Sequence, residues 1–409
     1  MAKYRHAKGL SPLQILLIVG ITVVVLGLIA GTVFAVNHFN SDKEEPTTPT
    51  TVTKKPISTI DQTPTEPATE DENEKYTALA KEYMSTMTQD EKIYQMLMVT
   101  PEALTGVDVA TLAGDATKEA IENYPIGGIY YSASNFEDEQ QTTDLIKNSQ
   151  SYAKTPMFIA VSDEGGDNSP LASRFNATTT DNIYNKSGDA VVEDYASSLA
   201  LNLTKFGVNF NLAPCANIDG EYIFSTSEKS ASELAVSALK GFSSKGVIPA
   251  VKHFPVQNDS SKTLDELREA ELTTFASAID SGADVIMMSS AKVSAIEDTP
   301  SYLSQRTVTE LLVKEMRFDG LVVSANMSDS DAQAVVSAIK AGNNLILCPA
   351  DIEATVEAIK IGIAGGEISQ QQIESSVTKI LALKLKYGIL DSATPKTETN
   401  TETTGTTAQ

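Results

Sequence analysis

Short apolar runs alternate with longer amphipathic stretches along the middle of the chain, between Tyr76 and Leu390. Apolar runs of this length are typical of strands, and apolar positions three or four residues apart are typical of helices. Eight strands are predicted, at Met96–Thr100, Gly128–Ser132, Met157–Ser162, Val208–Ala213, Val247–Phe254, Val285–Ser289, Leu321–Ser324 and Asn344–Leu347. Helices are predicted between them, among others at Glu233–Phe242, Leu267–Ile279 and Ile352–Ile363.

Several of these strands are apolar throughout rather than alternately apolar and polar, as expected for strands that are covered on both faces. Their alternation with helices indicates an α/β fold with a parallel sheet built from strand–helix units. Eight such units favour a closed (β/α)8 TIM-type barrel over residues 76–391. An open, doubly wound sheet produces a similar alternation, and periodicity alone does not separate the two folds.

The segment Ile15–Val36 is uncharged, mostly apolar and long enough to cross a bilayer at about 1.5 Å per residue. Basic residues precede it and acidic residues follow it: Lys3, Arg5 and Lys8, then Asp42, Glu44 and Glu45. The positive-inside rule then places the N-terminus in the cytoplasm and the barrel outside, on a single-pass plasma-membrane anchor. A cleaved signal peptide is the alternative, because Val33–Ala35 resembles a cleavage site, but the apolar run is longer than usual for one.

Residues 38–75 and 392–409 are rich in Thr, and the first of these segments is also rich in Pro and Glu. Such segments bury too little apolar surface to offset the entropy lost on ordering. We therefore expect five parts: a cytoplasmic N-terminus (1–12), a transmembrane helix (13–37), a disordered linker (38–75), the barrel (76–391) and a disordered tail (392–409).

The composition, the net charge and the two cysteines limit the classes of protein and of binding partner that need to be considered. Of the 409 residues, 41% are hydrophobic and 21% are charged, which is ordinary for a globular protein with a sizeable core. The net charge of −23 excludes nucleic acid as a partner, because binding a phosphate backbone requires an excess of basic residues. Cys215 and Cys348 lie in apolar runs without metal-ligand spacing, so we expect two buried free thiols, no metal and no cofactor.

Polar residues close two of the predicted strands. Asp163 and Glu164 follow the third strand, and the fifth strand contains Lys252 and His253 near its end. In a (β/α)8 barrel the active site lies at the carboxyl ends of the strands. These four residues are therefore the candidate substrate-binding group, and His253 is the one histidine in the barrel segment.

Several stretches of the barrel segment, taken in order, resemble the barrel domain of glycoside hydrolase family 3, especially its single-domain β-N-acetylglucosaminidases. The similar stretches are Met87–Ile93, Pro125–Ile129, Gly207–Pro214, Ala250–Pro255 and Phe318–Ser324. The resemblance implies a retaining hydrolysis, in which a carboxylate attacks the anomeric carbon and a general acid protonates the leaving oxygen. It also implies that Lys252 contacts a sugar hydroxyl.

The residues that the resemblance assigns to catalysis are absent. The nucleophile position is Ala325, and the loop 256–262, which follows the fifth strand, lacks the histidine that serves as general acid in the acetylglucosaminidases. Asp329 and Asp331 are the carboxylates that could substitute for the nucleophile. Other sugar-contacting positions have changed as well: Ser162, Asp167, Asn217, Tyr222 and Ser290.

Three hypotheses follow. The first is a barrel that binds cell-wall or other glycans, or a protein partner, with hydrolysis lost or altered; Tyr130, Tyr131 and Tyr222 are its candidate rim aromatics. The alternative is an active β-N-acetylhexosaminidase that hydrolyses peptidoglycan fragments through an unmatched carboxylate. A minor alternative is an enzyme that forms a Schiff base through Lys252.

Overall fold

The strands close into a barrel. The computed structural model describes residues 70–172, 174–175 and 182–391. Eight parallel strands follow one another around the barrel in the order β1-β10-β9-β6-β5-β4-β3-β2, and β1 pairs with both β2 and β10. Their bounds are β1 Leu97–Val99, β2 Gly128–Tyr130, β3 Phe158–Val161, β4 Phe210–Asn211, β5 Ile248–Phe254, β6 Val285–Met288, β9 Leu321–Asn326 and β10 Leu345–Leu347. The predicted barrel is confirmed, and the open sheet is excluded.

Each predicted strand overlaps one strand of the barrel, but β4 is shorter than predicted. The Asn209 side chain, rather than a backbone carbonyl, accepts the hydrogen bond of Ile159 N at 2.8 Å, which replaces one rung of the ladder. Pro214 has no N–H with which to continue the strand. A small antiparallel hairpin, β7 (Lys292–Val293) and β8 (Glu297–Pro300), was not predicted, because its strands are short and largely polar.

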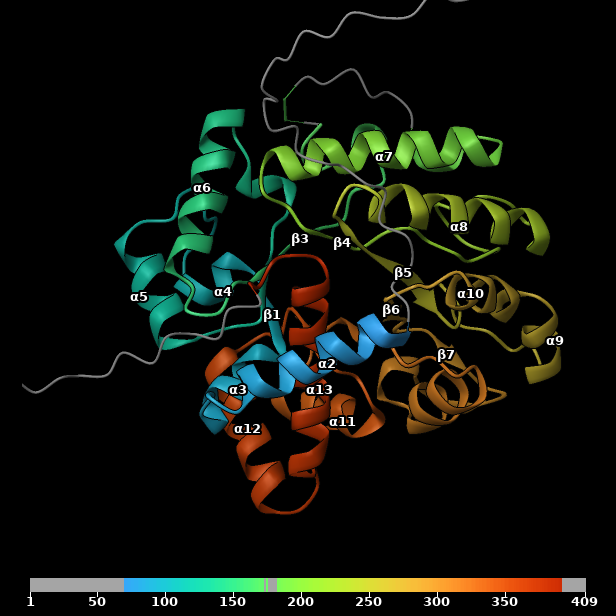
Figure 1. Cartoon of the computed structure of the whole chain (residues 1–409). Helices are drawn as coiled ribbons and strands as arrows, with labels where there is room; N and C mark the ends of the chain where they lie inside the picture. The colour runs from blue at the N-terminus through green and yellow to red at the C-terminus, as the bar shows by residue number, and fades with distance from the viewer. Residues whose placement is uncertain (1–69, 173, 176–181, 392–409) are drawn as a thin grey trace, which may run out of the picture. The chain divides into compact units, whose positions relative to one another are not determined.

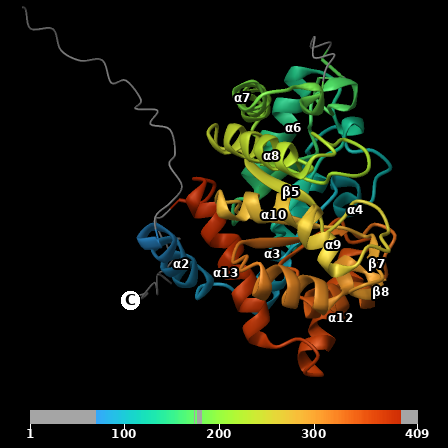
Figure 2. The ribbon, with the colours of Figure 1, turned by 90° about the vertical axis from the view of Figure 1, so that its right-hand side faces the viewer.

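Helices surround the strands, as the two views in Figures 1 and 2 show. They are α2 Glu70–Met84, α3 Gln89–Gln95, α4 Pro101–Thr105, α5 Asp115–Asn123, α6 Glu139–Tyr152, α7 Asp189–Lys205, α8 Glu228–Ser243, α9 Leu264–Glu269, α10 Glu271–Asp280, α11 Ala332–Ala341, α12 Ile352–Ala364 and α13 Gln370–Lys386. A π-helical segment, η5, covers Arg306–Glu315, and short 3₁₀ turns cover η1 Ala133–Asn135, η2 Gly166–Asn168, η3 Ile183–Asn185 and η4 Ser301–Leu303.

Two sequence predictions of helical structure need correction. Residues 70–75, which were expected to belong to the disordered linker, form the first turns of α2; this helix packs through Ala80, Tyr83 and Met84. The helix expected at Leu267–Ile279 is two helices, because Ala270 leaves the helical conformation at φ −125° and ψ −97°.

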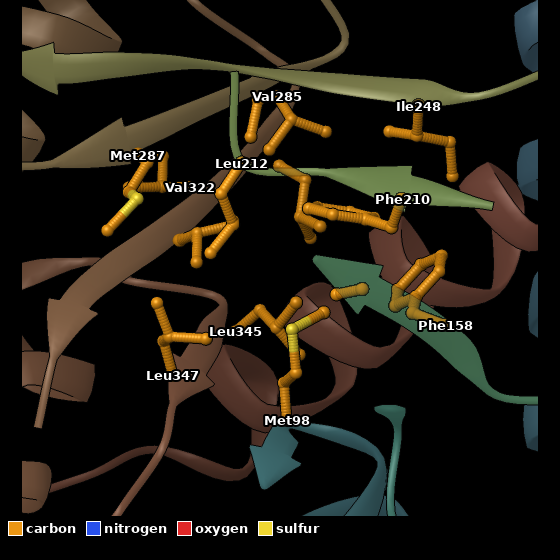
Figure 3. Packing of buried hydrophobic residues seen from close by; sticks show 14 of the residues in the cluster. Met98, Phe158, Phe210, Leu212, Ile248, Val285, Met287, Val322, Leu345 and Leu347 are labelled. Atoms are coloured by element: carbon orange, nitrogen blue, oxygen red, sulfur yellow. The ribbon is translucent and has the colours of Figure 1, made fainter. Parts of the chain in front are cut away.

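The interior of the barrel is filled by side chains (Figure 3). Alternate residues point inward where Figure 3 labels pairs of them, such as Phe210 with Leu212 and Val285 with Met287, and these side chains are buried. Such a packed interior is typical of the fold and leaves no channel through it. A ligand site must therefore lie at a rim of the barrel.

A charged residue is buried against this apolar layer. Lys384 of α13 is completely buried; its Nζ donates to Gln95 Oε1 at 2.8 Å and lies 4.9 Å from the centre of the Phe158 ring. Gln95 is held in turn, since its Nε2 donates to the carbonyl oxygens of Pro125 and Ile126. Burial lowers the pKa of Lys384 from the usual 10.5 to about 7.

Within the part of the chain that the structure describes, no helix combines the length and apolar character needed to cross a bilayer. The predicted anchor at Ile15–Val36 and the predicted tail at 392–409 lie outside the described residues.

The buried lysine makes stability depend on pH. Between pH 7 and 10.5 the unfolded chain binds a proton at Lys384 that the folded chain lacks, so the free energy of unfolding rises with pH across this window. The slope from this group approaches about 1.4 kcal/mol per pH unit. We expect Lys384→Met to lose this component, as measured by urea unfolding at pH 7, 8, 9 and 10. Lys229→Met, at a side chain that is 84% exposed, serves as the control. Equal slopes in Lys384→Met and the native protein would contradict the assignment.

Candidate active site

Two candidate residues from different strands form a buried ion pair at the carboxyl rim of the barrel. Glu164 follows β3, Lys252 lies in β5, and Lys252 Nζ is 2.8 Å from Glu164 Oε1. Only 9% of the Lys252 side chain and 15% of the Glu164 side chain are exposed. Lys252 Nζ also donates to Ser162 Oγ at 3.0 Å. The ammonium group therefore has two acceptors within the protein.

Tyr184, in η3, is a third member of this cluster. Its hydroxyl donates to Glu164 Oε1 at 3.0 Å and accepts from Cys215 N at 2.7 Å. Burial and the Glu164 carboxylate raise the pKa of Tyr184 well above its ordinary value. Burial raises the pKa of the Cys215 thiol to about 12, so this thiol is not a nucleophile at neutral pH. Cys215 and Cys348 are both buried and free, as predicted.

Asn217 holds the backbone of His253. Asn217 Oδ1 accepts from His253 N at 2.9 Å, and Asn217 Nδ2 donates to His253 O at 3.1 Å. An aspartate at position 217 could not make the second bond, because a carboxylate has no donor. Burial, together with the neighbouring charge of Lys252, lowers the pKa of His253 to about 3. The imidazole is therefore neutral at physiological pH.

No carboxylate occupies the end of β9. Ala325 is 4% exposed. Ser324 beside it donates through Oγ to Ala325 O at 2.8 Å and accepts from Leu347 N at 3.0 Å. Asp329 and Asp331 are both exposed, and Asp331 is the N-cap of α11, with its Oδ1 accepting from Ala334 N at 2.8 Å.

The sequence profile of the glycosyl hydrolase family 3 N terminal domain matches residues 88–383, which include all eight barrel strands. The chain belongs to glycosyl hydrolase family 3. It is 26% identical over 306 residues to a β-hexosaminidase of Idiomarina loihiensis, covering 68% of this chain and 90% of that protein. It is also 26% identical over 326 residues to β-hexosaminidase A of Pseudoalteromonas piscicida, covering 66% of this chain and 54% of that protein.

Solved structures of family 3 proteins share this fold. A family 3 β-N-acetylglucosaminidase from Paenibacillus sp. str. FPU-7 superposes with a TM-score of 0.68 at 24% identity, over 74% of this chain and 63% of that one. A β-N-acetylhexosaminidase from Beutenbergia cavernae superposes with a TM-score of 0.63 at 23% identity, over 73% of this chain and 98% of that one. At these identities the likeness is one of fold. The match with this chain spans about half of the length of the Pseudoalteromonas protein and 90% of the length of the Idiomarina protein.

The loop 256–262, which follows β5, is bound to the unpredicted hairpin. Asp259 Oδ1 accepts from Lys292 N at 2.8 Å, and Ser260 N donates to Lys292 O at 2.9 Å. Lys262 pairs with the buried carboxylate of Glu271. These contacts hold the loop against β7. The sequence of the loop contains no histidine.

Two of the residues predicted to contact a ligand, Asp163 and Tyr131, are engaged within the protein itself. Both carboxylate oxygens of Asp163 are occupied within its own loop, by Gly165 N at 2.9 Å and Ser169 Oγ at 2.7 Å, and burial raises its pKa. Tyr131 was predicted as a rim aromatic, and this is wrong: its ring is fully buried and its hydroxyl donates to Ser149 Oγ at 2.9 Å. Tyr130 is half-buried, and Tyr222 is 37% exposed.

Sequence reasoning missed Tyr184, which lies outside every predicted strand end. Its position beside Glu164 depends on a contact between loops: Ile183 N donates to Glu164 O at 2.8 Å, and Asn182 bridges to Gly165. A cavity of about 620 Å³ lies elsewhere, between α2, α13 and residues that precede β6 and β9, at the opposite rim of the barrel. Across the described ranges, no group of three or more His, Cys, Asp or Glu side chains is placed to hold a metal.

The buried pair predicts a strong energetic coupling. Glu164→Gln leaves the Lys252 ammonium buried without a charged partner, and Lys252→Met leaves the carboxylate in the same state. Each change should cost about 3 kcal/mol of unfolding free energy, because an unpaired buried charge is poorly solvated. The double variant should lose less than the sum of the two, which a double-mutant cycle by urea unfolding measures.

The exposed pair Lys205–Glu139, with side chains 54% and 59% exposed, is the matched control, and it should couple by less than about 1 kcal/mol. A coupling at Lys252–Glu164 no larger than that of the control pair would contradict the buried-pair interpretation.

Proposed function

We propose that this family 3 barrel binds glycans containing N-acetylglucosamine and has lost hydrolysis. One observation carries the proposal: the Lys252–Glu164 pair is retained at the rim, while the nucleophile position is Ala325. The glycan class rests on the relatives that are named β-hexosaminidase or β-N-acetylglucosaminidase. Glycans of the cell wall belong to this class.

Loss of hydrolysis follows from what a retaining reaction requires. A carboxylate must attack the anomeric carbon, and an acid must protonate the leaving oxygen. The methyl group of Ala325 cannot form a glycosyl-enzyme, and the loop 256–262 supplies no histidine. Loss of a single member of a catalytic unit commonly lowers the rate by several orders of magnitude. Both losses together favour binding without turnover.

The retained groups are suited to sugar hydroxyls. Lys252 has three N–H donors, of which two are directed to Glu164 and Ser162, so one remains for a ligand oxygen. His253 is neutral, and a neutral imidazole has one donor and one acceptor nitrogen. A hydroxyl group matches this pairing, because it also donates and accepts.

An active β-N-acetylhexosaminidase is the second candidate function. The names of the curated relatives favour it, and Asp329 lies exposed in the turn that follows β9. Asp331 is less suited to replace the nucleophile, because it already caps α11. Schiff-base chemistry at Lys252 is disfavoured because its ammonium group is paired with Glu164, and an ammonium nitrogen has no lone pair with which to attack a carbonyl carbon.

We also propose that the barrel is extracytoplasmic and anchored by Ile15–Val36. The basic residues before this run and the acidic residues after it support that orientation. The full chain should remain in the membrane fraction after carbonate extraction, and protease should reach the barrel only from the extracytoplasmic side. Release by carbonate would contradict the anchor.

The decisive assay compares turnover and binding in the full chain. We expect no hydrolysis of nitrophenyl β-N-acetylglucosaminide above the buffer rate, together with binding of N-acetylglucosamine by calorimetry. Lys252→Met should weaken binding about tenfold or more, a change of roughly 1.4 kcal/mol. Turnover by the native chain that is abolished by Asp329→Asn or Asp331→Asn would instead establish the hexosaminidase.

The low pKa of His253 predicts how binding depends on pH. Its folded-state value of about 3 lies below the usual 6.5, so the imidazole does not change charge between pH 5 and 8. Affinity for N-acetylglucosamine should therefore stay constant across this range when it is measured by titration at each pH. A loss of affinity centred near pH 6.5 would show that His253 titrates as an exposed histidine.

A further inference from the structure

A cavity at the amino rim of the barrel takes no part in the site described above. Its volume is about 620 Å³, and it lies between α2, α13 and the residues that lead into β6 and β9. Figures 1 and 2 show α2 beside α13 on the outside of the barrel. Cavities that hold small ligands typically measure about 300 to 1,000 Å³. The cavity is therefore large enough for an organic molecule.

Small and polar side chains leave this space between the two helices. The lining positions of each helix recur every three or four residues, so each helix turns one face to the cavity. On α2 this face carries Asn73 and Thr77, and on α13 it carries Ser375, Thr378 and Ala382. A helix face that packs against a neighbour usually carries larger apolar side chains. The short side chains at these positions do not fill the space.

Lys379 of α13 is a half-buried cation in the wall of the cavity. Its Nζ donates to Gly320 O at 2.9 Å, and no carboxylate of the described residues forms an ion pair with it. A lysine ammonium group has three N–H donors, so two of them remain for a ligand. Burial lowers the pKa of Lys379, and the charge of Asp319 opposes this effect. An anionic group of a ligand would compensate the poorly solvated charge.

Asp319 is an acidic group in the same wall. It is exposed, and within the described ranges its carboxylate makes neither a hydrogen bond nor an ion pair. Asp284, which also lines the cavity, is engaged instead: Lys386 Nζ lies 2.6 Å from its Oδ1, and the Tyr387 hydroxyl donates to its Oδ2 at 2.9 Å. The cavity thus offers a ligand one cation and one carboxylate that act on each other electrostatically.

Neutral polar groups complete the lining. Among the described residues, the side chains of Asn73, Thr77, Gln371 and Ser375 make no hydrogen bond. Amide and hydroxyl side chains can both donate and accept. Each peptide bond has one N–H donor and one carbonyl acceptor. These side chains therefore match the groups between the two charged ends of a peptide.

We propose that this cavity binds a short peptide with free termini, whose carboxylate contacts Lys379 and whose ammonium group contacts Asp319. The site is separate from the proposed glycan site, because its residues lead into the amino ends of β6 and β9, whereas Lys252 and Glu164 lie at the carboxyl rim. The proposal concerns binding and involves no covalent step.

Titration calorimetry on the full chain with the tripeptide of alanine tests the site. Two blocked forms are compared with it, one amidated at the C-terminus and one acetylated at the N-terminus. Each should bind about tenfold more weakly, because each lacks one charge-assisted hydrogen bond. Free alanine should also bind more weakly, since it fills only a small part of the cavity. Equal affinities for alanine and the tripeptide would overturn the assignment of a peptide.

Two variants assign the ends of the peptide. Lys379→Met should weaken the free tripeptide about tenfold and abolish its advantage over the amidated form. Asp319→Asn, at an exposed side chain, should abolish the advantage over the acetylated form, and it is the second variant in case Lys379→Met is unstable. Lys229→Met, at a side chain that is 84% exposed, is the surface control and should bind as the native chain does.

Three results would overturn the site: no binding of the tripeptide, equal affinities for its free and blocked forms, or an affinity that Lys379→Met and Asp319→Asn both leave unchanged. None of these results bears on glycan binding at the carboxyl rim, which the assay with N-acetylglucosamine tests separately.

Discussion

Closure of the parallel sheet is the constraint on which the rest of this structure depends. Because β1 pairs with both β2 and β10, the barrel has no free edge, and the carboxyl ends of all eight strands meet at one rim. The interior is packed with large apolar side chains, so polar groups that close the strands have no place except that rim. Lys252 and Ser162 lie 90 positions apart in the chain and meet there at 3.0 Å.

The buried ion pair connects stability with recognition. Lys252 and Glu164 are each poorly solvated, so each needs the other, and Tyr184 adds a neutral donor to the same carboxylate oxygen. Removing either member of such a pair would leave the other charge buried and unpaired, which costs unfolding free energy. The presence of the pair depends on no catalytic step and is therefore compatible with an alanine at position 325.

Side chains in the loops around the pair bind the backbone of the rim. Asn217 uses both ends of its amide on the His253 backbone, and Asp163 uses both carboxylate oxygens on its own loop. The loop after β5 is bound to the β7–β8 hairpin. At these positions the side chains are engaged in holding the backbone of the rim.

The sequence by itself determined the α/β class, the position of every barrel strand, the family, and Lys252 and Glu164 as rim residues. Apolar periodicity and strand-end motifs are local properties, and a local pattern can be interpreted without knowing what lies opposite it. The burial of Tyr131 and the place of Tyr184 beside Glu164 were decided by tertiary structure alone. Each depends on contacts between segments far apart in the chain, and no pattern within a single segment carries that information.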